Sequence, residues 1–99
     1  MIAVLGYLHV DPAALDGLLP AMKTTMEKTR AEDGCERYSL AVEDAAEGKV
    51  SISEKWRDMD ALKAHGAAPH MADFNKALAG KVKGAEIHAY EASNETKLA

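Results

Sequence analysis

The segment Ile2–Val10 constrains the fold most, because it is rich in β-forming residues and apolar on both of its alternating faces. One face carries Ile2, Val4, Leu8 and Val10, and the other carries Ala3, Leu5 and Tyr7. Apolar residues on both faces are typical of a strand that is covered on both sides of its sheet. We therefore predict that helices cover one face of the sheet and that a second large body, such as another copy of the sheet, meets the other.

A helix is predicted directly after this strand. Asp11 suits the N-cap position and Pro12 the first helical position. The apolar residues that recur at helical spacing are Leu15, Leu18, Leu19, Met22 and Met26. Pro20 lacks a backbone donor, so we expect a kink or a late helix start near it. Gly34 is predicted to end the helix in the left-handed conformation.

The rest of the chain alternates between strand and helix patterns. The further strands are predicted at Cys35–Glu43, Lys49–Trp56 and Ala85–Ser93, with the turn 44–48 joining the first two into a hairpin. A short helix starts at Asp58 and is interrupted at 66–68, and Pro69 begins a second helical piece. This β-α-β-β-α-β order predicts the ferredoxin-like α+β class, with a four-stranded antiparallel sheet. We expect one domain over residues 1–99, ending in a frayed or partner-swapped tail.

Charge and cysteine content limit the partners and the compartment. The net charge of -4, with acidic and basic residues interspersed, gives no positive surface for phosphates, so nucleic acid is not expected as a partner. Cys35 is the single cysteine, which excludes an internal disulfide and fits a reducing cytoplasm. No window approaches the roughly eighteen apolar residues of a membrane span. We therefore predict a cytoplasmic protein without membrane contact.

Side chains that can carry chemistry gather between residues 54 and 71. Trp56 is either a large core residue or the wall of a pocket in which its indole N–H fixes a polar substrate atom. Glu54 shares its strand face and needs a partner if buried, for which an ion pair across strands or subunits is expected. His65 stands at the edge of a helical apolar stripe, where it either faces a cavity as a general base or caps the helix.

The remaining histidines have open roles. His70 looks toward the core side of its helix, or it satisfies backbone groups near the break at 66–68. His9 and His88 occupy outer strand positions, where they border either the same cavity or a dimer face. His65 and His70 are separated by a glycine-proline break and match no zinc-ligand spacing, so no metal site is predicted.

Several runs of residues resemble the antibiotic biosynthesis monooxygenase domain family, which includes quinol monooxygenase-like and cofactor-free anthrone oxygenase-like members. These runs are Glu32–Tyr38, Ser53–Trp56, Asp60–His65 and Pro69–Met71 with Phe74, and they occur in the family's order. The resemblance implies a dimeric α+β barrel with a ligand cavity between sheet and helices. It also implies a reaction without flavin or metal, in which a deprotonated phenolic substrate reacts directly with dioxygen.

The same resemblance implies roles for five residues. His65 is expected to accept the phenolic proton, while Trp56 and Phe74 enclose the rings of the substrate. His70 or Tyr38 is expected to hydrogen-bond the developing oxyanion. Water must be kept out of such a pocket, because it would quench the carbanion.

Two functions follow, and a third does not. The first is a cofactor-independent monooxygenase that oxidises a quinol or an anthrone-like polyphenol. The second is a non-catalytic dimeric module that binds a small hydrophobic ligand as a stress or regulatory accessory protein. Haem degradation, known in the same superfamily, is not predicted, because His65 stands where a tryptophan is expected and Asn75 lies near the place of the ligating histidine.

Overall fold

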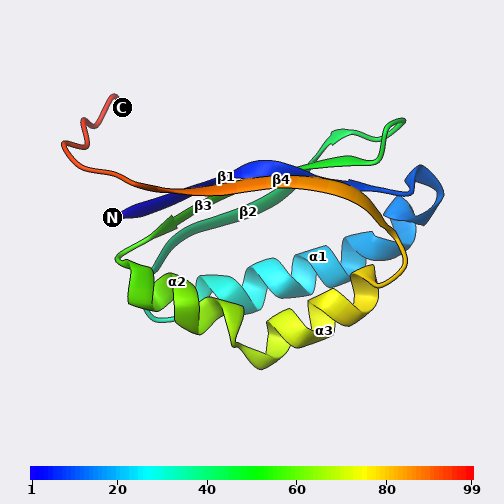
Figure 1. Ribbon diagram of the computed structural model, residues 1–99, viewed down its shortest axis with the longest axis horizontal. Helices are drawn as coiled ribbons and strands as arrows, with labels where there is room; N and C mark the ends of the chain where they lie inside the picture. The colour runs from blue at the N-terminus through cyan, green and yellow to red at the C-terminus, as the bar shows by residue number, and fades with distance from the viewer.

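Four antiparallel strands form one sheet, and all the helices lie against the same face of it (Figure 1). The computed structural model describes all of residues 1–99. Its elements are β1 (Ile2–Val10), a 3-10 turn (Pro12–Ala14), α1 (Leu15–Arg30), β2 (Cys35–Asp44), β3 (Lys49–Trp56), α2 (Met59–Gly66), α3 (Pro69–Leu78) and β4 (Val82–Glu91). The predicted ferredoxin-like α+β fold is confirmed.

The strand order is β2-β3-β1-β4, which places β1 inside the sheet with a partner on each side. The register pairs Val4 of β1 with Glu54 of β3 and with Ala89 of β4. Residues paired in this way share a face, and Val4 is 4% exposed on the helix side. The opposite side of the sheet, which we call the outer face, carries Leu5 and Tyr90, each 53% exposed in the single chain.

The helical segment after β1 begins as predicted, with Asp11 as the cap and Pro12 in the first turn, and the Asp11 carboxylate accepts from the Ala13 N–H at 3.0 Å. This first turn is a 3-10 turn, however, and the α-helical part begins at Leu15 and continues through Pro20 to Arg30. Leu19, predicted on the apolar face, is 41% exposed. The buried face consists of Leu15, Leu18, Met22, Thr25 and Thr29. The interior therefore changes from apolar to polar along this helix.

The turns between the elements explain where the remaining strands begin and end. Gly34 takes the predicted left-handed conformation, with φ of 82°, but it does not cap the helix: α1 ends at Arg30 with Ala31 as its C-cap, and Gly34 makes the turn into β2. The hairpin of β2 and β3 is confirmed, and Gly48 closes it with φ of 70°. Strand β4 begins earlier than predicted, because its pairing with β1 reaches Val82, where the register shifts. No helix is long and apolar enough to cross a membrane.

Candidate active site

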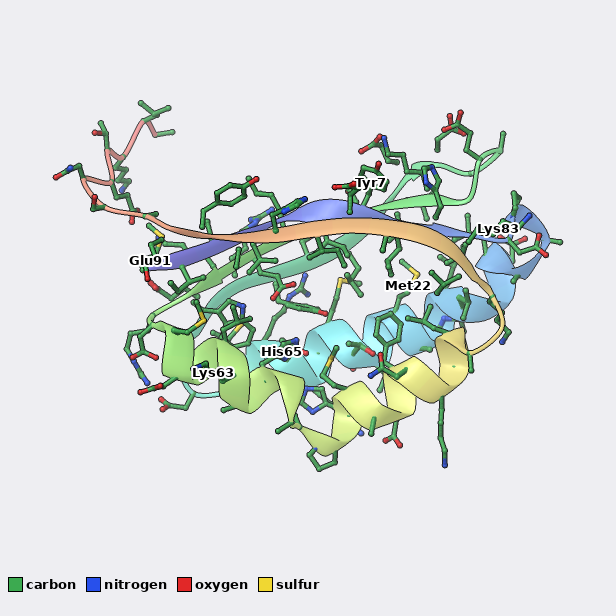
Figure 2. The ribbon with its side chains drawn as sticks, in the orientation of Figure 1. Tyr7, Met22, Lys63, His65, Lys83 and Glu91 are labelled. Carbon is green, nitrogen blue, oxygen red and sulfur yellow. The ribbon has the colours of Figure 1, made fainter.

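A cavity of about 150 Å³ lies between the sheet and the helices. Figure 2 shows His65 of α2 in the layer between the helices and the sheet. The polar side chains that line the cavity include Tyr38, Glu54 and His65. Its apolar lining includes Leu8, Leu40, Ile52, Phe74, Leu78 and Ile87. Polar groups among many apolar ones are typical of a site that orients a small, largely apolar ligand.

The position of His65 follows from how α2 begins and ends. The Asp58 carboxylate caps the helix by accepting from the Ala61 N–H at 2.8 Å. The helix ends at Gly66, and Pro69 starts α3 with its fixed backbone angle. This short break between the helices lets His65, at the end of α2, and His70, at the start of α3, turn toward the same point.

That point is the carboxylate of Glu32, in the turn after α1. Its Oε2 atom lies 2.7 Å from Nδ1 of His65 and 3.0 Å from Nε2 of His70. The Thr29 hydroxyl is 3.2 Å from the same Nε2 of His70. The side chains of His65, His70 and Glu32 are 7%, 14% and 16% exposed. The turn after α1 and the helices α2 and α3 thus contribute to one hydrogen-bonded cluster, of which His65 lines the cavity.

The cluster leaves one ring nitrogen of His65 available. Because Nδ1 is engaged by Glu32, which does not line the cavity, Nε2 is the nitrogen that a ligand can reach. A carboxylate on Nδ1 holds the ring in one tautomer and stabilises the imidazolium that forms when Nε2 takes a proton. The arrangement is that of a general base with its orienting group.

The same three side chains are the types that bind metal ions, and their ligand atoms lie within 4.8 Å of one another. Ligand atoms about 2.1 Å from a tetrahedral zinc ion are separated by roughly 3.4 Å. The contacts of Glu32 with the two histidines, at 2.7 and 3.0 Å, are shorter than this and fit shared protons. A cation would require Glu32 to move away from both rings.

The sheet supplies a second pair of hydrogen-bonded side chains, Glu54 and Trp56 of β3. The indole N–H of Trp56 donates to the Glu54 carboxylate at 2.8 Å. Burial raises the pKa of Glu54, although the Trp56 N–H and the nearby His65 oppose the rise. Burial also raises the pKa of Tyr38, with further increases from the carboxylates of Glu54 and Glu32. Tyr38 therefore stays a neutral hydrogen-bond donor at physiological pH.

The structure brings together most of the residues singled out from the sequence. His65, Tyr38 and Phe74 line the cavity. His70 lies behind His65 and contacts Glu32, and not the backbone at 66–68. Trp56 is 0% exposed and does not line the cavity; its ring packs against that of His65, with centroids 4.8 Å apart.

The structure also places Glu54 and the two remaining histidines. Within the chain, Glu54 forms no ion pair across strands, because its partner is the neutral Trp56 indole on the same face of β3; an ion pair across subunits stays a prediction. His88 lies on the outer face with the Glu86 carboxylate 2.9 Å away, and both side chains are more than half exposed. His9 packs against Tyr7 on that face, and Figure 2 shows Tyr7 on the side of the sheet opposite His65.

Sequence reasoning missed Glu32 as a site residue. Glu32 enters the sequence-based predictions only as the first residue of the run Glu32–Tyr38 that resembles the family, and no role is predicted for it. A usable signal was present: two histidines predicted to look toward the core need a common polar partner, and buried polar groups are almost always hydrogen-bonded. Glu32, a carboxylate at the end of the helix that packs on α3, was available for that role.

The fold and the cavity define a class: a ferredoxin-like α+β domain with a ligand cavity between its helices and its sheet. The chain is 30% identical over 74 residues to "Putative monooxygenase YcnE" of Bacillus subtilis, which covers 75% of this chain and 78% of that protein. It is 33% identical over 73 residues to Rv0793 of Mycobacterium tuberculosis, covering 74% and 71%. The solved structure of Rv0793 superposes with a TM-score of 0.83 at 26% identity, covering 97% of this chain and 98% of that one.

The solved structure of "a putative antibiotic biosynthesis monooxygenase" from Deinococcus radiodurans superposes with a TM-score of 0.87 at 27% identity over 100% of this chain and 99% of that one. Residues 1–77 match the antibiotic biosynthesis monooxygenase family. The chain belongs to this family. The resemblance noted in the sequence is thereby confirmed, and it supports a monooxygenase-like function.

Proposed function

We propose that this protein is a cofactor-independent monooxygenase that oxidises a quinol with dioxygen in the cavity between sheet and helices. The observation that carries the proposal is the short contact between Glu32 and Nδ1 of His65, which leaves Nε2 of a buried histidine available to a cavity ligand. In this reaction Nε2 takes the proton of a substrate hydroxyl. The Tyr38 hydroxyl donates to the oxyanion that forms.

The reaction balances without a reductant. A ring carbon of the quinolate first forms a C–O bond with dioxygen. The O–O bond breaks in a later step. One oxygen atom stays on the ring, and the other leaves as water with the protons released by the substrate. The substrate supplies all the electrons, because it is both hydroxylated and oxidised from quinol to quinone. The protein's part is to hold the substrate, remove its proton and keep water out of the apolar cavity.

The size of the cavity favours a quinol over an anthrone. A cavity of about 150 Å³ in a protein core is known to hold a single benzene ring. The cavity here has a similar volume of about 150 Å³. A one-ring quinol fits this volume, and a two-ring quinol fits if the edge near Ile87 of β4 opens. A tricyclic anthrone is too large for the cavity as it stands.

The proposal is tested by oxygen uptake with a one-ring benzoquinol and with a reduced naphthoquinone, after dialysis against chelator and without flavin. We expect uptake above the spontaneous rate and a hydroxylated quinone as the product. His65→Ala should lower the rate by about tenfold or more, as expected for loss of a general base. Lys63→Ala is the matched control, because Lys63 is an exposed residue of the same helix and lies outside the cavity.

Catalase separates this reaction from simple quinol oxidation, which yields hydrogen peroxide. Oxygen returned on addition of catalase would show that no oxygen atom entered the substrate. A His65→Ala rate equal to that of the native protein would remove His65 from the mechanism. No uptake with any of several quinols would favour a module that only binds its ligand.

We also propose that the protein forms a homodimer through the outer face of the sheet. In the single chain this face exposes Leu5 and Tyr90, although β1 is apolar on both alternations. Light scattering after size exclusion should give the mass of a dimer. Leu5→Lys should shift it to monomer, while Leu19→Lys, an exposed leucine on α1, should not. A native monomer would overturn this proposal.

A further inference from the structure

The cluster of His65, Glu32 and His70 connects two separate hollows of the molecule. His65 lines the cavity between sheet and helices. His70 lines a groove between α1 and α3, on the other side of the cluster, together with Lys28 and Asp73. Glu32 lines neither hollow, but its Oε2 atom contacts both imidazoles. A continuous row of hydrogen-bonded groups therefore leads from the cavity to the helical surface.

We infer that Glu32 and His70 conduct protons between His65 and solvent in the groove between α1 and α3. The inference rests on the proposed function, in which His65 takes a proton from substrate. A second proton then leaves Nδ1 of His65 for Oε2 of Glu32 and passes to Nε2 of His70. His70 releases its Nδ1 proton to water, which leaves His65 neutral with its proton on Nε2. When His65 gives that proton to the departing oxygen, a proton returns from water through His70 and Glu32 to Nδ1, so that His65 ends as the neutral imidazole with which it began.

Thr29 has a place in this row. It is 0% exposed, and its hydroxyl lies 3.2 Å from Nε2 of His70. When that nitrogen carries no proton, the hydroxyl donates to it and holds the ring as an acceptor toward Glu32. This role explains why Thr29, a polar residue, is buried on the face of α1 whose first half is apolar. Thr29 is a positioning residue, because it acts through His70.

The side chains around His65 show why a proton path through Glu32 and His70 would be useful. His65 is faced by Glu32, by Glu54 and Tyr38 of the sheet, and by His70. The proton that His65 takes from the substrate lies on the cavity side of the ring, and the Glu32 carboxylate contacts the other nitrogen. While substrate fills the cavity, water cannot reach the ring from that side. A route behind the ring, away from the substrate, allows the base to be reset.

A competing exit exists at Glu32 itself. Glu32 borders a shallow depression beside α2, together with Asp60 and Ala64. Its side chain is 16% exposed, compared with 14% for His70. Protons that left directly from Glu32 would make His70 dispensable. The two routes differ in a property that can be measured without any substrate.

The experiment measures the exchange of the His65 ring proton on Nδ1 with water, by NMR saturation transfer on the ¹⁵N-labelled full-length protein. His70→Gln keeps the size of the side chain and a hydrogen bond to Glu32 but cannot carry a proton. We expect it to slow the exchange by about tenfold or more. Lys76→Ala, an exposed change on the same helix, should leave the exchange rate unchanged.

The variant His70→Ala keeps the test valid if His70→Gln does not fold correctly. His70→Ala opens space for a free imidazole, so added imidazole should raise the exchange rate of this variant in proportion to its concentration. It should have no such effect on His70→Gln. Exchange in His70→Gln as fast as in the native protein, or no response of His70→Ala to imidazole, would overturn the inference and assign the exit to Glu32. Because no quinol is present, these results stand apart from the oxygen-uptake assay.

Discussion

The two halves of α1 face very different interiors. In the first half, the buried residues are Leu15, Leu18 and Met22, which join the apolar core with Val10 and Val50. In the second half, the buried residues are Thr25 and Thr29, and the turn that follows carries Glu32. The same helix therefore seals the apolar half of the molecule and supplies the polar half, where the cavity and both inner histidines lie.

This difference separates what holds the fold from what performs chemistry. The apolar half excludes water and gains its stability from burial, which requires no particular polar partner. The polar half contains groups that are costly to bury, and every one of them must find a hydrogen bond. It does so through Glu32 and the Trp56 indole, and no buried side-chain polar atom is left without a partner.

The largest effect is expected from Leu18→Ala, in the apolar half. Leu18 is 1% exposed, and truncation of a buried leucine costs about 2–5 kcal/mol through lost burial and the cavity left behind. Urea denaturation should show this loss. Oxygen uptake per folded molecule should stay near the native value, because Leu18 does not line the cavity. A tenfold loss of activity in folded protein would contradict the division into two halves.

A smaller loss of stability is expected from Glu32→Ala, in the polar half. The change leaves His65 without an acceptor for its Nδ1 proton, which costs about 1–3 kcal/mol for a buried donor. His70 keeps Thr29 as a partner. In contrast to Leu18→Ala, this variant should also lose most of its oxygen uptake. Glu32→Gln, which keeps an acceptor, should recover stability but not activity.

The sequence predicted the frame better than the site. The alternation in β1 and the hairpin β2–β3 were predicted with the correct bounds or within one residue, because local periodicity determines them. The buried face of α1 was only partly predicted: Leu19 was placed inside and Thr29 was not considered. Tertiary packing determines which residues of α1 are buried, because the Thr29 hydroxyl contacts His70, a residue far along the chain.

The site required contacts that no local pattern contains. The spacing of His65 from Leu62 put it at the edge of an apolar stripe and left two roles open, facing a cavity or capping the helix; the fold places it in the lining of the cavity. Glu32 was missed, because its partners lie 33 and 38 residues away. Of the two roles left open for Trp56, the core residue is the one found: it is fully buried and its ring packs against His65, whereas the wall of the pocket, the role implied by the family resemblance, is made by other residues. These relations depend on how three elements meet, and only the assembled fold defines them.

A purely catalytic effect is expected from Tyr38→Phe. The ring of Tyr38 is buried, and the variant keeps it, so stability should change little. Loss of the hydroxyl removes the donor to the substrate oxyanion, which should lower the rate of oxygen uptake by about tenfold or more. The Michaelis constant should change less than the turnover number, because the oxyanion forms only during the reaction. A raised Michaelis constant with an unchanged turnover number would indicate that Tyr38 binds the substrate equally well in its ground state, and would contradict this role.

The smallest effect is expected from Glu54→Gln, and it depends on pH. Burial raises the pKa of Glu54 above its ordinary value of 4.5, so the folded protein holds this proton more tightly than the unfolded chain does. The stability that this provides is complete below pH 4.5 and is lost as pH rises through the raised pKa. Glutamine keeps an acceptor for the Trp56 N–H and carries no charge. The free energy of unfolding of the variant, relative to the native protein, should therefore increase between pH 4.5 and neutrality and then level off. Urea denaturation at each pH measures the difference in free energy of unfolding between the two proteins. A difference that stays constant over this range would mean that the Glu54 carboxylate is as well hydrated as one on the protein surface.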